Sequence, residues 1–147
     1  MKSKNTRYEN LRLNSNYSQK GVAKILKVKC DTYSKWEREI NDMPLDKCNE
    51  LVNLYRVSFD YLLCLSDSKK IQNNINKSID WEKLNSRMLY LRKLKGYTQE
   101  ELSNKLGFAQ TTYSNYENGT RKITTFKLYL IAKFYNVSFD WLVGRIN

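Results

Sequence analysis

The sequence predicts an all-α protein made of two tandem five-helix domains joined by a polar linker. The first observation is a repeat: residues 17–62 align without a gap on residues 97–142, at a constant offset of 80. Starting the comparison at residues 5 and 85 gives about 18 identities, so one structural unit is duplicated. The second is apolar spacing typical of helices, with no stretch that alternates well enough to indicate a strand.

The helices are most clearly marked in the second copy. Trp81, Leu84, Met88 and Leu91 are spaced for one face of a first helix. A capping box at residues 98–101, Thr-Gln-Glu-Glu, opens a second helix. The third and fourth helices are expected over residues 110–118 and 125–135, and Ser138 is expected to cap a short fifth helix.

Glycines separate these helices. Each follows an apolar-periodic stretch, where a helix ends with a left-handed residue; they are Gly96, Gly107, Gly119 and Gly144. The first copy has Asn16, Lys27, Glu39 and Cys64 at these positions. A left-handed Lys27 costs roughly 1–2 kcal/mol, so the first copy is predicted to have the same fold with lower stability.

The repeat and the composition set the domain boundaries. We expect a diverged domain over residues 1–66, a linker over 67–79 and a well-formed domain over 80–147. The linker reaches about 46 Å when fully extended. A continuous helix through this segment is the alternative.

The charge favours an acidic partner. The net charge is +11, and it is spread as +4 over residues 1–66, +2 over 67–79 and +5 over 80–147. Such a balance is typical of a protein that binds nucleic acid, although a lysine-rich solvated surface would give it too.

Several other functions lack support in the composition. The chain has three cysteines, no histidine and no C-x-x-C pair, so we expect reduced, half-buried thiols and no metal site. No paired carboxylates or phosphate-binding glycine loop suggest an enzyme, a cofactor or a small-molecule ligand. No apolar run is long enough for a membrane span, and a cytoplasmic location is expected.

One motif in the second copy resembles a known family. Gln99, Ser103 and Gly107 at four-residue spacing are followed by Gln-Thr-Thr-Tyr-Ser-Asn-Tyr-Glu-Asn-Gly at residues 110–119. This pattern is similar to the helix-turn-helix of the Cro/phage-repressor (XRE-like) DNA-binding family, whose domains have five helices. The resemblance is strong over residues 84–144 and weaker over residues 4–64.

The resemblance implies a role for the third helix. Such a helix enters the major groove of DNA and presents its N-terminal side chains to base edges. The base-reading candidates in the second copy are Gln110, Thr111, Thr112, Ser114 and Asn115. The phosphate-binding candidates are Gln99, Arg121 and Lys122. An ordinary solvated helix face is the alternative.

The first copy departs from this pattern at several positions. Its candidates for DNA contact are Gln19, Lys29, Asp31, Thr32 and Lys35. Asp31 can accept a hydrogen bond from cytosine but repels phosphate. We therefore expect the second copy to supply most of the affinity, and the first copy to read a different half-site or to dock a protein.

Two further sets of residues are shared by both copies. The resemblance implies structural salt bridges between Arg92 and Glu117 and between Arg12 and Glu37. Association candidates lie at the last helix of each copy, where an exposed Phe precedes a large aromatic residue; they are Phe59, Tyr61, Phe139 and Trp141. Core packing is the alternative for these aromatics, and either a homodimer or an intramolecular pseudo-dimer would use them.

Two functional hypotheses follow. The first is a sequence-specific regulator of transcription that binds double-stranded DNA, a repressor of phage, mobile-element or antitoxin type that acts by occupying a promoter. The second keeps the fold but uses residues 1–66 to bind another protein, such as a host-defence or transcription component.

Overall fold

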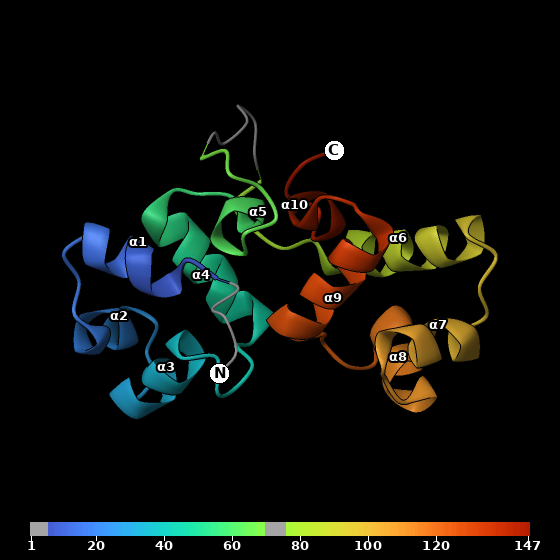
Figure 1. Cartoon of the computed structure of the whole chain (residues 1–147), viewed down its shortest axis with the longest axis horizontal. Coiled ribbons are helices and arrows are strands. Elements are labelled where there is room, and N and C mark those ends of the chain that lie inside the picture. The colour runs from blue at the N-terminus through green and yellow to red at the C-terminus, as the bar shows by residue number, and fades with distance from the viewer. Residues whose placement is uncertain (1–5, 70–75) are drawn as a thin grey trace. The chain divides into compact units, whose positions relative to one another are not determined.

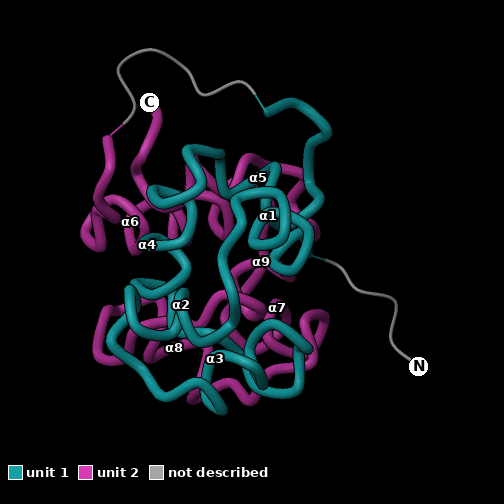
Figure 2. The backbone as a smooth tube through the Cα atoms, turned by 90° about the vertical axis from the view of Figure 1, so that its left-hand side faces the viewer, with its two compact units in different colours: residues 1–73 teal, residues 74–147 magenta. Residues whose placement is uncertain are grey.

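The computed structural model describes residues 6–69 and 76–147, and these residues form ten helices and no strand (Figure 1). The chain divides into two compact units, residues 1–73 and residues 74–147 (Figure 2). Each unit contains five helices in the order expected from the repeat. The all-α tandem architecture predicted from the sequence is confirmed.

Unit 1 repeats the plan with short helices. They are α1 (Tyr8–Asn14), α2 (Gln19–Ile25), α3 (Cys30–Glu37), α4 (Leu45–Tyr55) and α5 (Phe59–Leu62). Ser18 and Ser58 accept hydrogen bonds from the backbone N–H groups of Gly21 and Tyr61, so α2 and α5 are capped as the sequence indicates.

Unit 2 has the same order of helices. They are α6 (Trp81–Leu94), α7 (Gln99–Leu106), α8 (Gln110–Glu117), α9 (Thr125–Tyr135) and α10 (Phe139–Leu142). At the start of α7, Thr98 and Glu101 form the predicted reciprocal capping box. Ser138 caps α10 by accepting from the backbone N–H of Trp141.

The core of unit 2 lies where the helical spacing placed it. Its fully buried members come from all five helices of the unit; they include Leu84, Met88, Leu102, Tyr113, Leu128, Ile131, Phe139 and Leu142. Two expected inward residues differ: Trp81 and Leu106 are only half-buried, because they lie at the first and last positions of their helices. On α9, where either Phe134 or Tyr135 was expected inward, Tyr135 is buried and Phe134 is exposed.

Left-handed turns end the helices in both units. The four glycines of unit 2 have φ between 75° and 81°. The residues at the same four positions of unit 1 also have positive φ, including Lys27 at 59°. A fifth such position, Arg56 in unit 1 and Asn136 in unit 2, has no glycine in either copy and was not recognised in the sequence.

The units extend further than the sequence boundaries suggested. Arg7 donates to Asp67 at 2.8 Å, which ties that residue to unit 1. The backbone N–H groups of Asn76 and Asp80 donate to the carbonyls of Arg145 and Val143, and the Asp80 side chain caps α6. Asp67 and Asn76, which lie within the predicted linker over 67–79, are therefore bonded to unit 1 and unit 2, respectively. The part of it at residues 70–75 lies outside the described residues. The alternative of a continuous helix does not hold for the described flanks, because α5 ends at Leu62 and α6 begins at Trp81.

Candidate nucleic-acid interface

The α7–turn–α8 segment of unit 2 has the geometry of a helix-turn-helix. Gly107 ends α7 with φ 76° and ψ 23°, which reverses the chain direction in few residues. The Ser103 side chain is fully buried, and its hydroxyl donates to the carbonyl of Glu100 at 2.9 Å. A larger side chain at this position would meet the core, so a small residue is what allows α7 to pack closely.

Helix α8 has a buried face and a polar outer face. Tyr113 and Tyr116 are buried and anchor the helix on the core. The base-reading candidates lie on the remainder of the surface: Gln110 and Thr111 are exposed, and Thr112, Ser114 and Asn115 are half-buried. The five residues thus share one helix, and their first two members lie at its N-terminus. Their contact with bases remains a prediction.

Glu117, at the end of α8, is the acceptor of a buried network. Arg92 of α6 donates to both of its carboxylate oxygens at 2.8 Å, and the ion pair is shielded from water because the two side chains are only 13% and 5% exposed. Arg92 also donates to the carbonyl of Tyr97 at 2.9 Å. The network therefore joins α6, the loop after it and α8. This is the ion pair expected from the sequence.

Gln99 belongs to the same network. Its side-chain amide donates to Glu117 Oε1 at 3.2 Å, a contact that the sequence did not suggest. The amide group carries two N–H donors, so one of them remains for a phosphate oxygen. A phosphate contact by Gln99 remains a prediction, and its side chain would be held in place for it by Glu117.

The pKa of the Glu117 carboxyl reflects this environment. Burial by itself would raise that pKa, but the hydrogen bonds from Arg92 and Gln99 favour the charged form, and the net effect lowers it below its ordinary value. The hydrogen bond with Glu117 correspondingly raises the pKa of Arg92. Both groups are charged at neutral pH.

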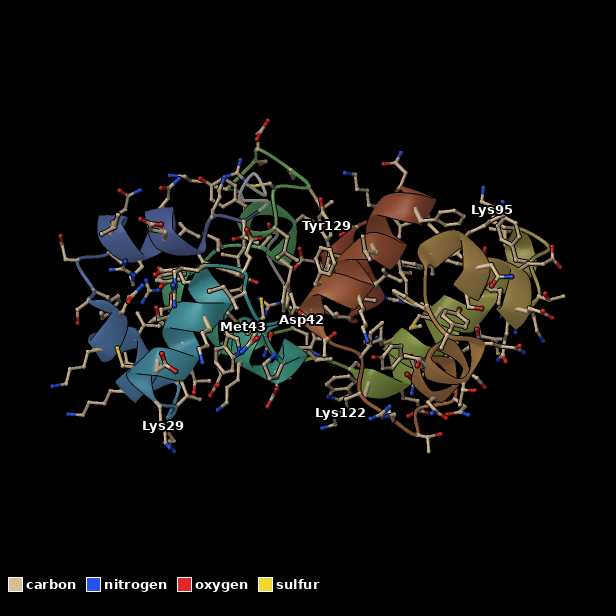
Figure 3. The ribbon with its side chains drawn as sticks, turned by 60° about the horizontal axis from the view of Figure 1, so that its bottom comes forward. Lys29, Asp42, Met43, Lys95, Lys122 and Tyr129 are labelled. Carbon is tan, nitrogen blue, oxygen red and sulfur yellow. The ribbon has the colours of Figure 1, made fainter. Side chains whose placement is uncertain are left out.

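Arg121 and Lys122 lie in the loop between α8 and α9 and are exposed. The backbone N–H of Arg121 donates to the carbonyl of Asn115 at 3.1 Å, which folds the loop back against the end of α8. The Lys122 ammonium lies 4.8 Å from the centre of the Trp81 ring, and Figure 3 shows its place on the surface. Arg121 is thus held by its backbone at the end of α8, and the Lys122 ammonium lies against α6; contact of either side chain with phosphate remains a prediction.

Unit 1 presents a different set of charges. On α3, Asp31 and Lys35 form an ion pair at 3.1 Å, so they partly neutralise one another. Lys29, labelled in Figure 3, is exposed immediately before the helix, and Thr32 is half-buried on it. The buried network is repeated here: Arg12 donates to Glu37 at 2.7 Å, and Gln19 donates to the same carboxylate.

The prediction of an exposed Phe near the last helix of each copy is wrong. Phe59 and Phe139 are fully buried, because each begins its short helix facing the core. Only Tyr61 and Trp141 of the association candidates reach the surface, and both are half-buried. A contact with a partner through the two phenylalanines is therefore excluded by their burial.

Two arginines explain why Tyr61 and Trp141 are partly covered. Arg7 lies 4.1 Å from the centre of the Tyr61 ring, and Arg87 lies 4.5 Å from the centre of the Trp141 ring. Each also donates to the backbone carbonyl of the aromatic residue it covers. Arg7 and Arg87 occupy equivalent positions in the two copies, and this identity was the sequence signal that could have indicated their shared role.

The cysteines and carboxylates of the described residues form no further candidate site. Cys30 and Cys64 are exposed and Cys48 is buried, all as free thiols, in contrast to the half-buried state expected for them. Among the described residues, no cluster of carboxylates and cysteines is placed to hold a metal ion. None of the helices described is long and apolar enough to cross a membrane.

The five-helix arrangement and the turn between the second and third helices define each unit as a helix-turn-helix domain. The chain belongs to the helix-turn-helix family HTH_3, whose pattern matches residues 9–62 and again residues 88–142. The two matches confirm the resemblance to the XRE-type family and the tandem duplication.

Curated relatives resemble one part of the chain. An uncharacterised HTH-type transcriptional regulator of Bacillus subtilis (strain 168), YobD, is 38% identical over 58 residues, which is 40% of this chain and 52% of that protein. The HTH-type transcriptional regulator ImmR of the same organism is 39% identical over 62 residues, covering 42% of this chain and 49% of ImmR. The chain thus spans about half the length of these relatives. No solved structure gives a significant match.

Proposed function

We propose that this protein is a sequence-specific, double-stranded DNA-binding regulator of transcription. The observation that carries the proposal is the outer face of α8, where Gln110 and Asn115 flank hydroxyl side chains on a helix that is anchored through its opposite face. Gln and Asn side chains match the donor and acceptor pattern of adenine in the major groove, and threonine methyls match the thymine methyl.

The surrounding charges support the same role. Arg121 and Lys122 stand next to α8, and the chain has a net charge of +11. Lys and Arg contacts to phosphates fix the orientation of a domain on the duplex, and the bases are then read by the helix. The relatives named above, YobD and ImmR, are both described as HTH-type transcriptional regulators.

The proposal extends to repression. A domain of this size that occupies the major groove of a promoter excludes polymerase, so we propose a repressor of the phage or mobile-element type. The tandem units provide two reading heads, of which unit 2 supplies most of the affinity. Its α8 carries no acidic residue on the reading face, whereas α3 of unit 1 carries Asp31.

The test is a selection from random duplexes with the full chain. The expected result is an enriched motif that includes A·T pairs, and a repeat of the selection with an Asn115→Ala variant should lose preference at one position. A gel shift on the selected site should weaken steeply as salt rises, because counterions are released on binding. Enrichment of no motif by the wild-type chain would exclude sequence-specific reading.

A further inference from the structure

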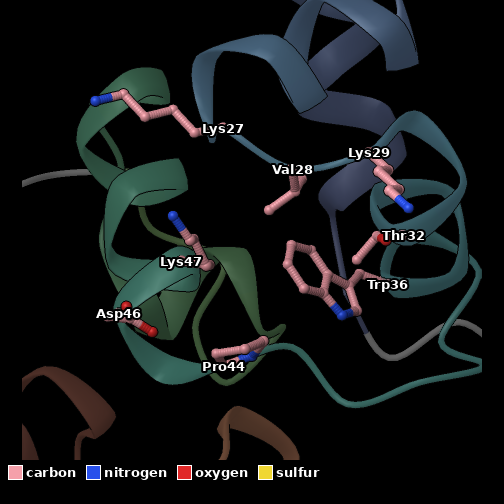
Figure 4. Close-up of a pocket in the computed structure, with 8 residues that line it drawn as sticks. All are labelled: Lys27, Val28, Lys29, Thr32, Trp36, Pro44, Asp46 and Lys47. Atoms are coloured by element: carbon pink, nitrogen blue, oxygen red, sulfur yellow. The ribbon is translucent and has the colours of Figure 1, made fainter.

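Unit 1 contains an open groove of about 770 Å3 beside α3 (Figure 4). Its apolar side is formed by Val28 and Trp36, with Pro44 at one end. Figure 4 shows the Val28 side chain and the Trp36 ring directed into the same space. A groove of this size accommodates side chains of a bound polypeptide.

The charges at the groove favour an anionic occupant. Lys27, Lys29 and Lys47 line it together with a single carboxylate, Asp46. Lys47 is already engaged, since it donates to the carbonyl of Leu26 at 2.8 Å and pairs with Glu50 at 3.3 Å. Within the described part of the chain, Lys27 and Lys29 form no ion pair, and both are exposed.

Unit 2 lacks these features at the equivalent positions. Gly107 and Ala109 stand where unit 1 has Lys27 and Lys29, and Phe108 stands in place of Val28. The Lys127 ammonium lies 5.9 Å from the centre of the Phe108 ring and donates to the Tyr116 hydroxyl at 3.2 Å. Phe108 is larger than Val28, and Lys127, the equivalent of Lys47, lies against its ring.

We propose that the groove of unit 1 binds an acidic peptide segment of another protein. An apolar side chain of that segment packs against Val28 and Trp36, and its flanking carboxylates pair with Lys27 and Lys29. Burial of one aromatic side chain supplies most of the affinity, and the lysines select acidic sequences.

A peptide fits the groove better than the DNA backbone does. A phosphodiester chain gains nothing from the apolar side formed by Val28 and Trp36, whereas an apolar side chain of a peptide is buried against it. Moreover, unit 2 carries the better set of base-reading candidates without the two lysines. The two lysines are therefore not a requirement of DNA reading by this fold.

The position of the groove has a consequence for regulation. Lys29 and Thr32 line the groove and also belong to the set of residues through which unit 1 would contact DNA. A bound peptide would cover both, so peptide and DNA would compete for unit 1. Such a partner would weaken binding to a two-part operator without contacting unit 2.

The test uses the full chain and a fluorescent peptide in which Asp and Glu residues flank a single Phe. Fluorescence anisotropy at low ionic strength should show binding. Two control peptides, one with Asn and Gln in place of the acids and one with Ala in place of Phe, should each bind about tenfold more weakly. Equal binding of the three peptides, or no binding of the acidic one, would overturn the proposal.

Variants of the protein distinguish binding in the groove from nonspecific charge attraction, because each should change the affinity for the acidic peptide in a stated direction. Lys27→Gly and Lys29→Ala introduce the residues of unit 2, and each should weaken the acidic peptide about three- to fivefold. Val28→Phe should fill the groove and abolish binding, and Asp46→Asn should strengthen it. Lys24→Ala is the matched control. Lys24 is an exposed residue of α2 outside the groove, and its substitution removes the same charge.

The folded state of each variant is checked by circular dichroism, and Lys27→Gly is expected to fold because it relieves a left-handed lysine. If Lys24→Ala weakens the peptide as much as Lys29→Ala does, the binding is nonspecific and the proposal fails. A second outcome would also overturn the proposal. If a duplex without the operator displaces the peptide from the wild type, and the same duplex binds the Val28→Phe variant more weakly, the groove is a site for the DNA backbone. The peptide assay contains no operator DNA, so its failure leaves the proposed DNA-binding function intact.

Discussion

At the residue scale, Glu117 connects three helices through one carboxylate. It lies at the end of α8 and accepts hydrogen bonds from Arg92 on α6 and Gln99 on α7. Because α7 and α8 form the helix-turn-helix, this carboxylate holds α8 against α6 and α7. The same arrangement in unit 1 centres on Glu37, with Arg12 and Gln19 as the donors.

Removal of the Glu117 charge should therefore destabilise unit 2. Glu117→Gln leaves the Arg92 guanidinium buried without a counter-charge, at an expected cost of ~3–5 kcal/mol in the free energy of unfolding. Urea unfolding followed by circular dichroism measures it. Glu100→Gln on the exposed surface of α7 is the control and should change stability by less than about 0.5 kcal/mol. A Glu117→Gln variant that unfolds no earlier than the wild type would contradict the structural role.

The Glu117 carboxyl should also make the stability of unit 2 depend on pH in the acid range. Its pKa is lowered in the folded state from an ordinary value of 4.5, so its contribution to stability is complete above that pH and is lost as the pH falls through the lowered value. The free energy of unfolding of the wild type should decrease more steeply below about pH 4.5 than that of Glu117→Gln. Parallel curves for the two proteins in this range would show that Glu117 does not carry the effect.

At the scale of elements, the helix ends differ more between the units than the helices do. Lys27 ends α2 with φ 59°, where unit 2 has Gly107 with φ 76°. A side chain with a Cβ is strained in this conformation, whereas glycine adopts it freely. Open space surrounds the position of a Cβ at Gly107, so the backbone conformation alone distinguishes the two residues.

Exchange of these two residues gives a paired prediction. Lys27→Gly should stabilise unit 1 by roughly 0.5–1 kcal/mol, since relief of strain exceeds the entropy that glycine adds to the unfolded chain. Gly107→Lys should destabilise unit 2 by a similar amount. Thermal unfolding of the two variants measures both, and a shift of the same sign in both would contradict the argument.

Helix α8 and the loop after it should respond differently to substitution. Asn115→Ala should reduce affinity for the selected operator by about 1–3 kcal/mol and relax the preference at one base position. Arg121→Ala should weaken binding to all duplexes alike and reduce the salt slope by about 1. Gel shifts on the operator and on a scrambled duplex over a range of salt separate the two effects. Loss of preference in Arg121→Ala would reverse the assigned roles.

At the scale of the whole molecule, both units carry net positive charge, but their candidate binding surfaces differ in chemistry. Unit 2 has a reading helix without acidic residues on its outer face, and unit 1 has the Asp31–Lys35 pair and the lysine-lined groove. A duplicated domain can keep one copy for its original partner while the other diverges. The proposed roles of the units follow from this contrast.

Separation of the units should reveal this asymmetry. A fragment of residues 74–147 should bind the operator more tightly than a fragment of residues 1–73. These limits retain the bonds of Asp67, Asn76 and Asp80 to their own units, which a cut at residues 66 and 80 would lose in part. Titration of each fragment on the same duplex measures the difference, after circular dichroism has shown that it is helical. Equal affinities would end the idea of a dominant second unit.

Much of the fold and of the candidate site could be predicted because it depends on local sequence. The capping box at Thr98 and Glu101 and the left-handed glycine at 107 involve only neighbouring residues, and the repeat allowed each feature of unit 2 to be sought again in unit 1. The outward positions on α8 follow from helical spacing once Tyr113 and Tyr116 are assigned to the core.

Sequence patterns predicted the number, order and type of the helices, and the family resemblance implied the position of the helix-turn-helix and the two Arg–Glu ion pairs. The burial of Phe59 and Phe139, the bond between Gln99 and Glu117 and the groove in unit 1 became visible only in the folded chain. The difference is one of range, because caps, turns and helical faces arise from residues a few positions apart. Burial, a third partner for an ion pair and an open space depend on side chains that the fold brings together from distant parts of the chain.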